Sequence, residues 1–181
     1  AGIAVNWMNG QFYQEKDQSY LFEKFDRDCA ESPVGANGVI FTPAFSGKGA
    51  PYWDPYARAN LQNIGFHNTR ADFARALLEG IASEMNDCLN TMNALFQDRS
   101  FQFVRCAGGL TKSDLFNQIQ ADMYGIPVMR PKSQEATGLG AWISAAVCLN
   151  LYKDYNQALQ NAVQDFELRS YQPKAENHKL Y

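Results

Sequence analysis

Hydrophobic side chains recur at intervals of three or four residues in several separate stretches of the chain. The clearest stretch is residues 69–95, where Phe73, Leu77 and Ile81 fall on one face of a helix. Weaker patterns predict shorter helices at residues 3–8, 18–29, 113–124, 138–150 and 157–163. We expect residues 69–95 to form the longest helix and the small-residue-rich stretch 138–150 to form a buried one.

The long helix has a marked start and a narrow second face. Thr69 followed by Asp72 resembles a capping box, although Asp is shorter than the Glu that usually completes one. Ala76, Gly80 and Ser83 form a stripe of small side chains beside the apolar face. We expect another element to approach the helix closely along this stripe.

Short apolar runs between the helices predict strands at residues 39–41, 101–107 and 126–129, the first of them buried. Residues 42–68 are rich in Gly, Pro and aromatic residues, which excludes a regular helix. A connection of this length is usually functional or tightly packed on itself.

Helix ends are marked by Asn9-Gly10 and by Gly125, and the tail after Arg169 is polar. Strands and helices alternate along the chain, which is typical of an α/β domain. The 181 residues suffice for one domain with a hydrophobic core but are too few for two full α/β lobes. We therefore expect one α/β unit with a mixed sheet flanked by helices.

Composition and charge exclude several classes of function. The formal net charge is -3 and no Lys/Arg cluster occurs, which weighs against nucleic-acid binding. No run of about 20 apolar residues is present, so we expect no membrane span. The four cysteines, Cys29, Cys88, Cys106 and Cys148, show no metal-binding or disulfide spacing. We expect reduced, mostly buried thiols in a cytoplasmic protein, and no metal held by the side chains of this chain.

A pair of glycines separates the predicted strand 101–107 from the helix that follows it. Gly108 and Gly109 let the backbone approach a ligand closely, and the start of the next helix offers free N–H groups. Lys112 and Ser113 add a cation and a hydroxyl. By itself this pattern fits a tight turn as well as a phosphate-binding turn. The P-loop and dinucleotide-binding glycine motifs are absent, which argues against a P-loop enzyme or a Rossmann oxidoreductase.

Three blocks, in the same order along the chain, resemble the FGGY family of carbohydrate kinases. The first is residues 41–58 (FTPAFSGKGAPYWDPYAR), which is close to the loop of glycerol kinase-like members. The second is residues 59–79. The third is residues 108–141, which include GGLTKS at the glycine pair and EATGLGA from Glu135 onward. The resemblance extends from Ala1 to about Val163.

This resemblance implies an actin/hexokinase-type, ribonuclease H-like fold with two lobes around a cleft. Residues 1–181 would be part of the C-terminal, nucleotide-binding lobe, with the N-terminal lobe absent from this chain. The implied activity is transfer of the ATP γ-phosphate, with Mg²⁺, to a hydroxyl of a sugar or polyol. The family's catalytic base is an Asp that would lie upstream of Ala1, so no catalytic residue is assigned in this chain. The isolated lobe is expected to be inactive, to expose an apolar face and to form homo-oligomers.

The resemblance also implies the nucleotide-binding residues. Gly108, Gly109 and Leu110 would hold the nucleotide, with Gly109 at its phosphate end, and Ser113 would line the base pocket. His67 replaces a Gly that contacts the nucleotide in glycerol kinases, so its side chain would either crowd the nucleotide or stack on it.

Other departures leave the substrate and even the activity open. Asn63 stands where the family signature usually has Gly, and Trp142 replaces a usual Ala. The pair Cys106-Ala107 is closer to the ketose kinases, whereas residues 51–54 are closer to glycerol kinase. The alternative to a carbohydrate kinase lobe is a nucleotide-binding regulatory module or an inactive kinase-like module of the same fold.

Overall fold

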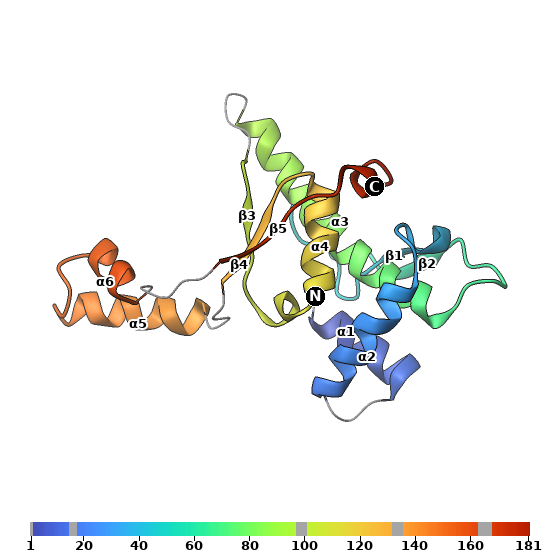
Figure 1. Cartoon of the computed structure of the whole chain (residues 1–181), viewed down its shortest axis with the longest axis horizontal. Coiled ribbons are helices and arrows are strands. Elements are labelled where there is room, and N and C mark those ends of the chain that lie inside the picture. Colours follow the sequence, from blue (N-terminus) through green and yellow to red (C-terminus); the bar gives the residue numbers. More distant parts are fainter. Residues whose placement is uncertain (1, 15–17, 97–100, 132–135, 163–167) are drawn as a thin grey trace.

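The computed structural model describes residues 2–14, 18–96, 101–131, 136–162 and 168–181. In chain order the elements are α1 (Gly2–Met8), the π-helical η1 (Asn9–Tyr13), α2 (Gln18–Glu31), η2 (Ala36–Gly38), β1 (Ile40–Thr42), β2 (Asn60–Gln62), α3 (Arg70–Leu95), β3 (Val104–Arg105), η3 (Gly109–Lys112), α4 (Asp114–Tyr124), β4 (Val128–Pro131), α5 (Ala136–Cys148), α6 (Tyr155–Ala162), β5 (Leu168–Tyr171) and α7 (Ala175–His178). The longest helix, α3, runs beside α4, while α5 and α6 extend away from the rest of the molecule (Figure 1).

A three-stranded mixed sheet lies beside α4, as the sequence predicted. β3 pairs with β4 in parallel, with Val104 opposite Val128, and β5 adds to the other edge of β4 in antiparallel orientation. A parallel pair needs a crossover connection, and α4 supplies it between β3 and β4. A separate antiparallel pair joins β1 to β2, with Phe41 opposite Leu61.

The main core forms where α1, α2, α3, α4 and β1 meet. Its largest fully buried side chains include Val5, Met8, Phe25, Leu77 and Phe116. A smaller cluster of Ala121, Val128 and Tyr171 packs α4 against the sheet. The two clusters together position the segment between β3 and α4 with respect to α3.

Helix α3 follows the prediction closely. Its first turn is held by a hydrogen bond from Thr69 N to Asp72 Oδ2 at 2.8 Å, so the short Asp side chain does complete the capping box. Gly80 faces β1, and a Cβ atom built on it would lie 3.1 Å from the carbonyl carbon of Phe41. The stripe of small residues is therefore a site of close approach, as expected.

Several boundaries and environments differ from the expectations. The first helix does not end at Asn9-Gly10, because η1 continues it to Tyr13. The strand expected at 39–41 forms one residue later, and only Phe41 in it is buried. The strand expected over 101–107 is reduced to the two residues of β3, and the one expected at 126–129 forms as Val128–Pro131.

The C-terminal third departs further. Helix α5 forms where expected, but only Ile143 and Ala146 are buried in it, so the expected buried helix is wrong for this chain. The polar tail after Arg169, for which no element was predicted, contains the end of β5 and α7. Glu135 and Val163, the latter expected at the end of a helix, lie outside the described residues.

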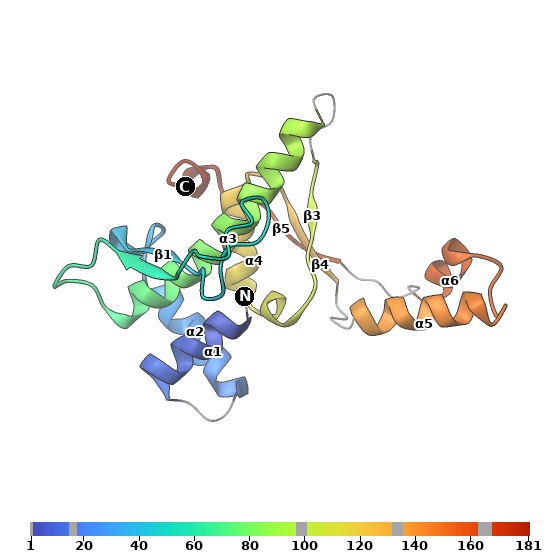
Figure 2. The same ribbon diagram turned by 180° about the vertical axis from the view of Figure 1, so that it is seen from behind.

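The long connection between β1 and α3 contains β2 and is otherwise irregular. It crosses over α3 (Figure 2), where Tyr52 Oη donates a hydrogen bond to Asp87 Oδ2 at 3.1 Å. Asn63 has a φ of 59°, and Asn tolerates this left-handed conformation better than most residues. All four thiols are free, but only Cys29 is buried, so the expectation of mostly buried thiols is wrong.

Candidate functional site

The glycine pair lies in the turn that leads from β3 into η3, with Gly109 as the first residue of η3. Cys106 N still donates to Met129 O of β4 at 3.0 Å, so the sheet pairing continues to the edge of the turn. Gly108 then takes a φ of 112°, a conformation that favours glycine. Thr111 closes the turn, because its Oγ1 donates to Gly108 O at 2.7 Å.

The start of α4 is held by side chains on both sides of the turn. Ser113 Oγ accepts a hydrogen bond from Phe116 N at 2.9 Å and donates one to Asp26 Oδ1 of α2 at 2.8 Å. Asn117, fully buried, donates through Nδ2 to Thr111 O at 2.8 Å. Burial raises the pKa of the Asp26 carboxyl, and the Ser113 hydrogen bond opposes this effect. These bonds give the glycine turn one defined conformation.

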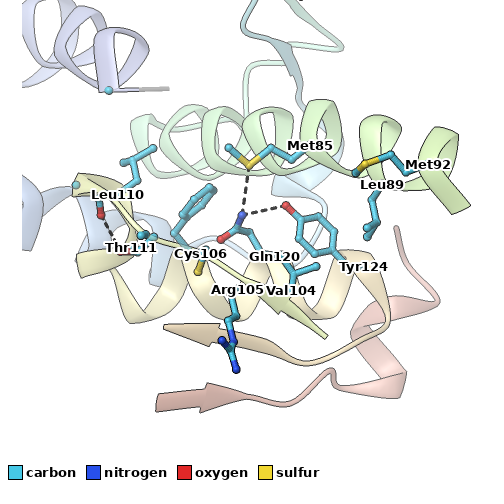
Figure 3. Close-up of a pocket in the computed structure, with 15 residues that line it drawn as sticks. Met85, Leu89, Met92, Val104, Arg105, Cys106, Leu110, Thr111, Gln120 and Tyr124 are labelled. Carbon is cyan, nitrogen blue, oxygen red and sulfur yellow. Dashed lines mark hydrogen bonds between the residues drawn. The ribbon is translucent and has the colours of Figure 1, made fainter. Parts of the chain in front are cut away.

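The turn opens onto a cavity of about 520 Å³. Its walls come from α1, the C-terminal half of α3, the β3–η3 segment and α4 (Figure 3). The lining residues are Gly2, Met85, Leu89, Met92, Val104, Arg105, Cys106, Ala107, Gly108, Gly109, Leu110, Thr111, Phe116, Gln120 and Tyr124. A Cβ atom built on Gly108 or on Gly109 would meet no atom within 4 Å. The glycines therefore leave open space at the rim of the cavity.

The inner wall of the cavity is largely apolar and uncharged. Gln120 Nε2 donates to Tyr124 Oη at 2.9 Å and contacts Met85 Sδ at 3.4 Å (Figure 3). Burial raises the pKa of Tyr124 to about 12, and it also raises the pKa of the Cys106 thiol, so both stay protonated at neutral pH. Such a wall suits a flat or apolar group, and the glycine rim can admit a charged one.

Three of the five residues predicted to bind nucleotide meet at this cavity. Gly108, Gly109 and Leu110 line it. Ser113 is buried behind the turn, where both hydrogen bonds of its hydroxyl are made to the protein. His67 is exposed in the turn before α3 and does not line the cavity, because the cavity is formed by the opposite end of that helix.

The lining residues of α1, α3 and α4 had been given no role at a site from the sequence. Those of α3 and α4 form two sets whose members lie three or four residues apart on one face of a helix: Met85, Leu89 and Met92 on α3, and Phe116, Gln120 and Tyr124 on α4. Gly2 approaches from α1, at the other end of the sequence. The regular spacing of each set was visible in the sequence, but not that the two faces enclose one space with the glycine turn.

Two negative findings apply to the described residues. None of their helices is both long and apolar enough to cross a membrane. No three His, Cys, Asp or Glu side chains among them are grouped so as to hold a metal ion.

Sequence relatives are carbohydrate kinases. The chain is 32% identical over 181 residues to a xylulose kinase of Staphylococcus epidermidis, covering 100% of this chain and 35% of that protein. It is 41% identical over 170 residues to a glycerol kinase of Dechloromonas aromatica, covering 92% of this chain and 32% of that protein. The chain thus spans about a third of the length of the curated relatives that it matches.

Solved structures agree with these sequence matches. Glycerol kinase from Plasmodium falciparum, determined with ADP, superposes with a TM-score of 0.77 at 26% identity, over 99% of this chain and 34% of that one. Xylulose kinase from Lactobacillus acidophilus superposes with a TM-score of 0.80 at 24% identity, over 100% of this chain and 35% of that one, and so shares its fold. The actin/hexokinase-type fold expected from the sequence is therefore confirmed.

The chain also matches the sequence pattern of a whole protein family. Residues 1–149 match the C-terminal domain of the FGGY carbohydrate kinases, and these residues include the glycine turn and all the residues that line the cavity. This chain belongs to the FGGY family of carbohydrate kinases, and its fold is that of the family's C-terminal domain.

Proposed function

We propose that this chain is part of the C-terminal, nucleotide-binding lobe of an ATP-dependent carbohydrate or polyol kinase of the glycerol kinase or xylulose kinase type. The observation that carries the proposal is the open glycine turn at the rim of an apolar cavity. Both Gly108 and Gly109 leave free space where a side chain would stand. A nucleotide needs both features, since its phosphates require close backbone approach and its base requires an apolar wall.

The residues present fit a nucleotide. The cavity volume, about 520 Å³, lies within the usual range for small-molecule sites. Gly109 would face the phosphates, and Leu110 with the facing walls of α3 and α4 would hold the base. When bound, ATP supplies the phosphoryl group to be transferred. The role of this chain is to bind the nucleotide, orient it and keep water from the base.

The rest of the catalytic machinery would lie outside these 181 residues. The described residues offer no grouped ligands for Mg²⁺, so we place the metal on the ATP phosphates and on the second lobe. We likewise place the catalytic base and most contacts to the sugar or polyol in that lobe. Phosphoryl transfer depends on positioning by both walls of a cleft, so we expect no kinase activity from residues 1–181 alone.

The test is to replace Gly109 by Val in the full-length protein that contains these residues and to measure ADP binding by calorimetry. We expect binding to be lost while the fold is retained, because the added side chain enters the ligand space and displaces no protein atom. Gly49→Val is the matched control, since Gly49 also has open space around it and does not line the cavity. Unchanged affinity in Gly109→Val would place the nucleotide elsewhere.

A second measurement separates the kinase from the inactive or regulatory module. The full-length protein should phosphorylate glycerol or a ketose with ATP. Nucleotide binding without any transfer to a panel of polyols and sugars would favour the module instead.

The isolated chain should also self-associate in sedimentation experiments, since α5 and its surroundings expose Trp142, Leu149 and Leu151.

A further inference from the structure

A second cavity lies on the other side of α3 from the glycine turn. We call it the α3 trough: its volume is about 600 Å³, and its walls come from α3, β1 with the residues beside it, the end of α4 and residues 180–181. On α3 it is lined by the stripe Ala76, Gly80 and Ser83, which lies roughly opposite Met85 and Leu89 because one helical turn holds about 3.6 residues. No described residue lines both cavities, so the trough is separate from the proposed nucleotide site.

Most polar side chains of the α3 trough are not committed to other parts of the protein. Among the described residues, no side-chain hydrogen bond is made by Thr42, Asn63, Ser83, Glu84 or Asn86. These side chains come from β1, from the residue after β2 and from α3, and they line one concave space. A concave site at which a few polar groups converge is the usual form of a small-molecule site.

Glu84 is the trough residue with the clearest need for a partner. Its Oε1 is buried, and no described residue donates a hydrogen bond to it. Burial raises the pKa of the Glu84 carboxyl, and the charge of Lys48 opposes this effect. Lys48 makes no ion pair with Glu84 in the described part of the chain, and its Nζ lies 5.0 Å from the centroid of the Tyr52 ring. A bound molecule that donates a hydrogen bond to this carboxylate would therefore be stabilised.

The end of the trough near the C-terminal residues has a fixed aromatic wall. Tyr181 Oη donates to Glu79 Oε1 at 2.8 Å, and Arg75 Nε donates to the same oxygen at 2.7 Å. The Glu79 carboxylate is thereby neutralised and committed to the protein. The C-terminal end of the chain lies beside α4 (Figure 1), and Met123 of α4 lines the same trough. The Tyr181 ring and the Met123 side chain add apolar surface to the uncommitted polar groups.

We propose that the α3 trough is a second ligand site, outside the nucleotide cavity, for a small neutral polyol or sugar. A hydroxyl group both donates and accepts hydrogen bonds, so it matches the carboxylates of Glu84 and Asp87 as well as the N–H donors of the trough. Those donors are Lys48, Asn63 and Asn86. A phosphorylated ligand would bring its negative charge against the two carboxylates, and an amine would leave the donors unmatched. The apolar wall suits the C–H groups of a polyol chain or a sugar ring.

The test follows the NMR signal of the Met123 methyl group in the full-length protein that contains these residues, labelled with ¹³C at its methionine methyl groups. The signal is assigned by its absence in Met123→Leu. Glycerol, xylitol and glucose are the neutral probes, and glycerol phosphate and putrescine are the charged ones. We expect a neutral probe to shift the Met123 signal saturably, and both charged probes to shift it less at equal concentration.

Variants of Glu84 connect the shift to the trough. Glu84→Leu removes the unpaired acceptor and should weaken binding of the neutral probe about 10-fold, the value of a hydrogen bond to a charged group. Glu84→Gln keeps an acceptor oxygen and should weaken it less. Glu23→Leu is the matched control, since Glu23 is exposed on α2 and does not line the trough, and it should bind the probe as the wild type does.

Each contrary result would overturn the inference. If no neutral probe shifts the Met123 signal, the trough is not a site for this class of ligand. If a charged probe shifts it as strongly, the ligand class is wrong. If the shift persists unchanged in Glu84→Leu, the probe acts from another site, such as the one for the phosphoryl acceptor. None of these results bears on the nucleotide site, which has its own test.

Discussion

Gly80 offers a sharp test of the packing between α3 and β1. It lies in the middle of α3, where a glycine normally weakens a helix relative to alanine. A Cβ atom at this position would overlap the carbonyl oxygen of Phe41 and lie 3.2 Å from Pro43 Cδ. The overlapped oxygen belongs to the backbone of a paired strand, so it cannot move aside by a change of side-chain rotamer.

Gly80→Ala changes the free energy of unfolding in two opposite ways, through helix propensity and through overpacking. The gain in helix propensity is about 1 kcal/mol. Overpacking of a well-packed site costs about 1–3 kcal/mol, and the rigid backbone of β1 puts this case at the upper end. We therefore expect a net loss of about 1–2 kcal/mol in the free energy of unfolding.

Urea and thermal unfolding of the full-length protein would measure the effect. Gly138→Ala is the matched control: Gly138 is also helical, in α5, but a Cβ atom there would meet no atom within 4 Å. The control should be stabilised by about 0.5–1 kcal/mol. If Gly80→Ala is stabilised as much as Gly138→Ala, the close approach of β1 to α3 does not exist and the reasoning is wrong.

Three further predictions concern single side chains. Burial acts to raise the pKa of Asp72, but hydrogen bonds from four neighbours lower it below its ordinary value of 3.8. The stability that this carboxylate contributes is present above about pH 4 and is lost as the pH falls, so the gap in unfolding free energy between wild type and Asp72→Asn should narrow in acid. Ser113→Ala removes the cap at Phe116 N and the bond to Asp26, and should cost about 1–2 kcal/mol in urea unfolding while weakening ADP binding only slightly. His67→Gly should change ADP affinity by no more than about twofold in calorimetry, because the exposed side chain lies outside the cavity; a larger change would place the nucleotide against it.

Local features of the sequence were sufficient for the elements that depend on neighbouring residues. The capped start of α3 at Thr69 and its apolar face follow from spacing within a few turns of helix. The same holds for the glycine turn and for Ser113 as the cap of α4, since both depend on residues within about six positions. The order of three long blocks also identified the family from the sequence alone.

The extent of the strands and the composition of the site depended on contacts between distant residues. β5 forms at the edge of the polar tail because Tyr171 pairs with Val128, and α5 stays largely exposed, with only Ile143 and Ala146 buried in it. The cavity joins Gly2 of α1 with Gln120 of α4. Helix periodicity and turn chemistry act over a few residues and can be predicted from the chain itself. Strand pairing and the set of faces that enclose the cavity depend on which surfaces meet after folding, so the tertiary structure alone decided them.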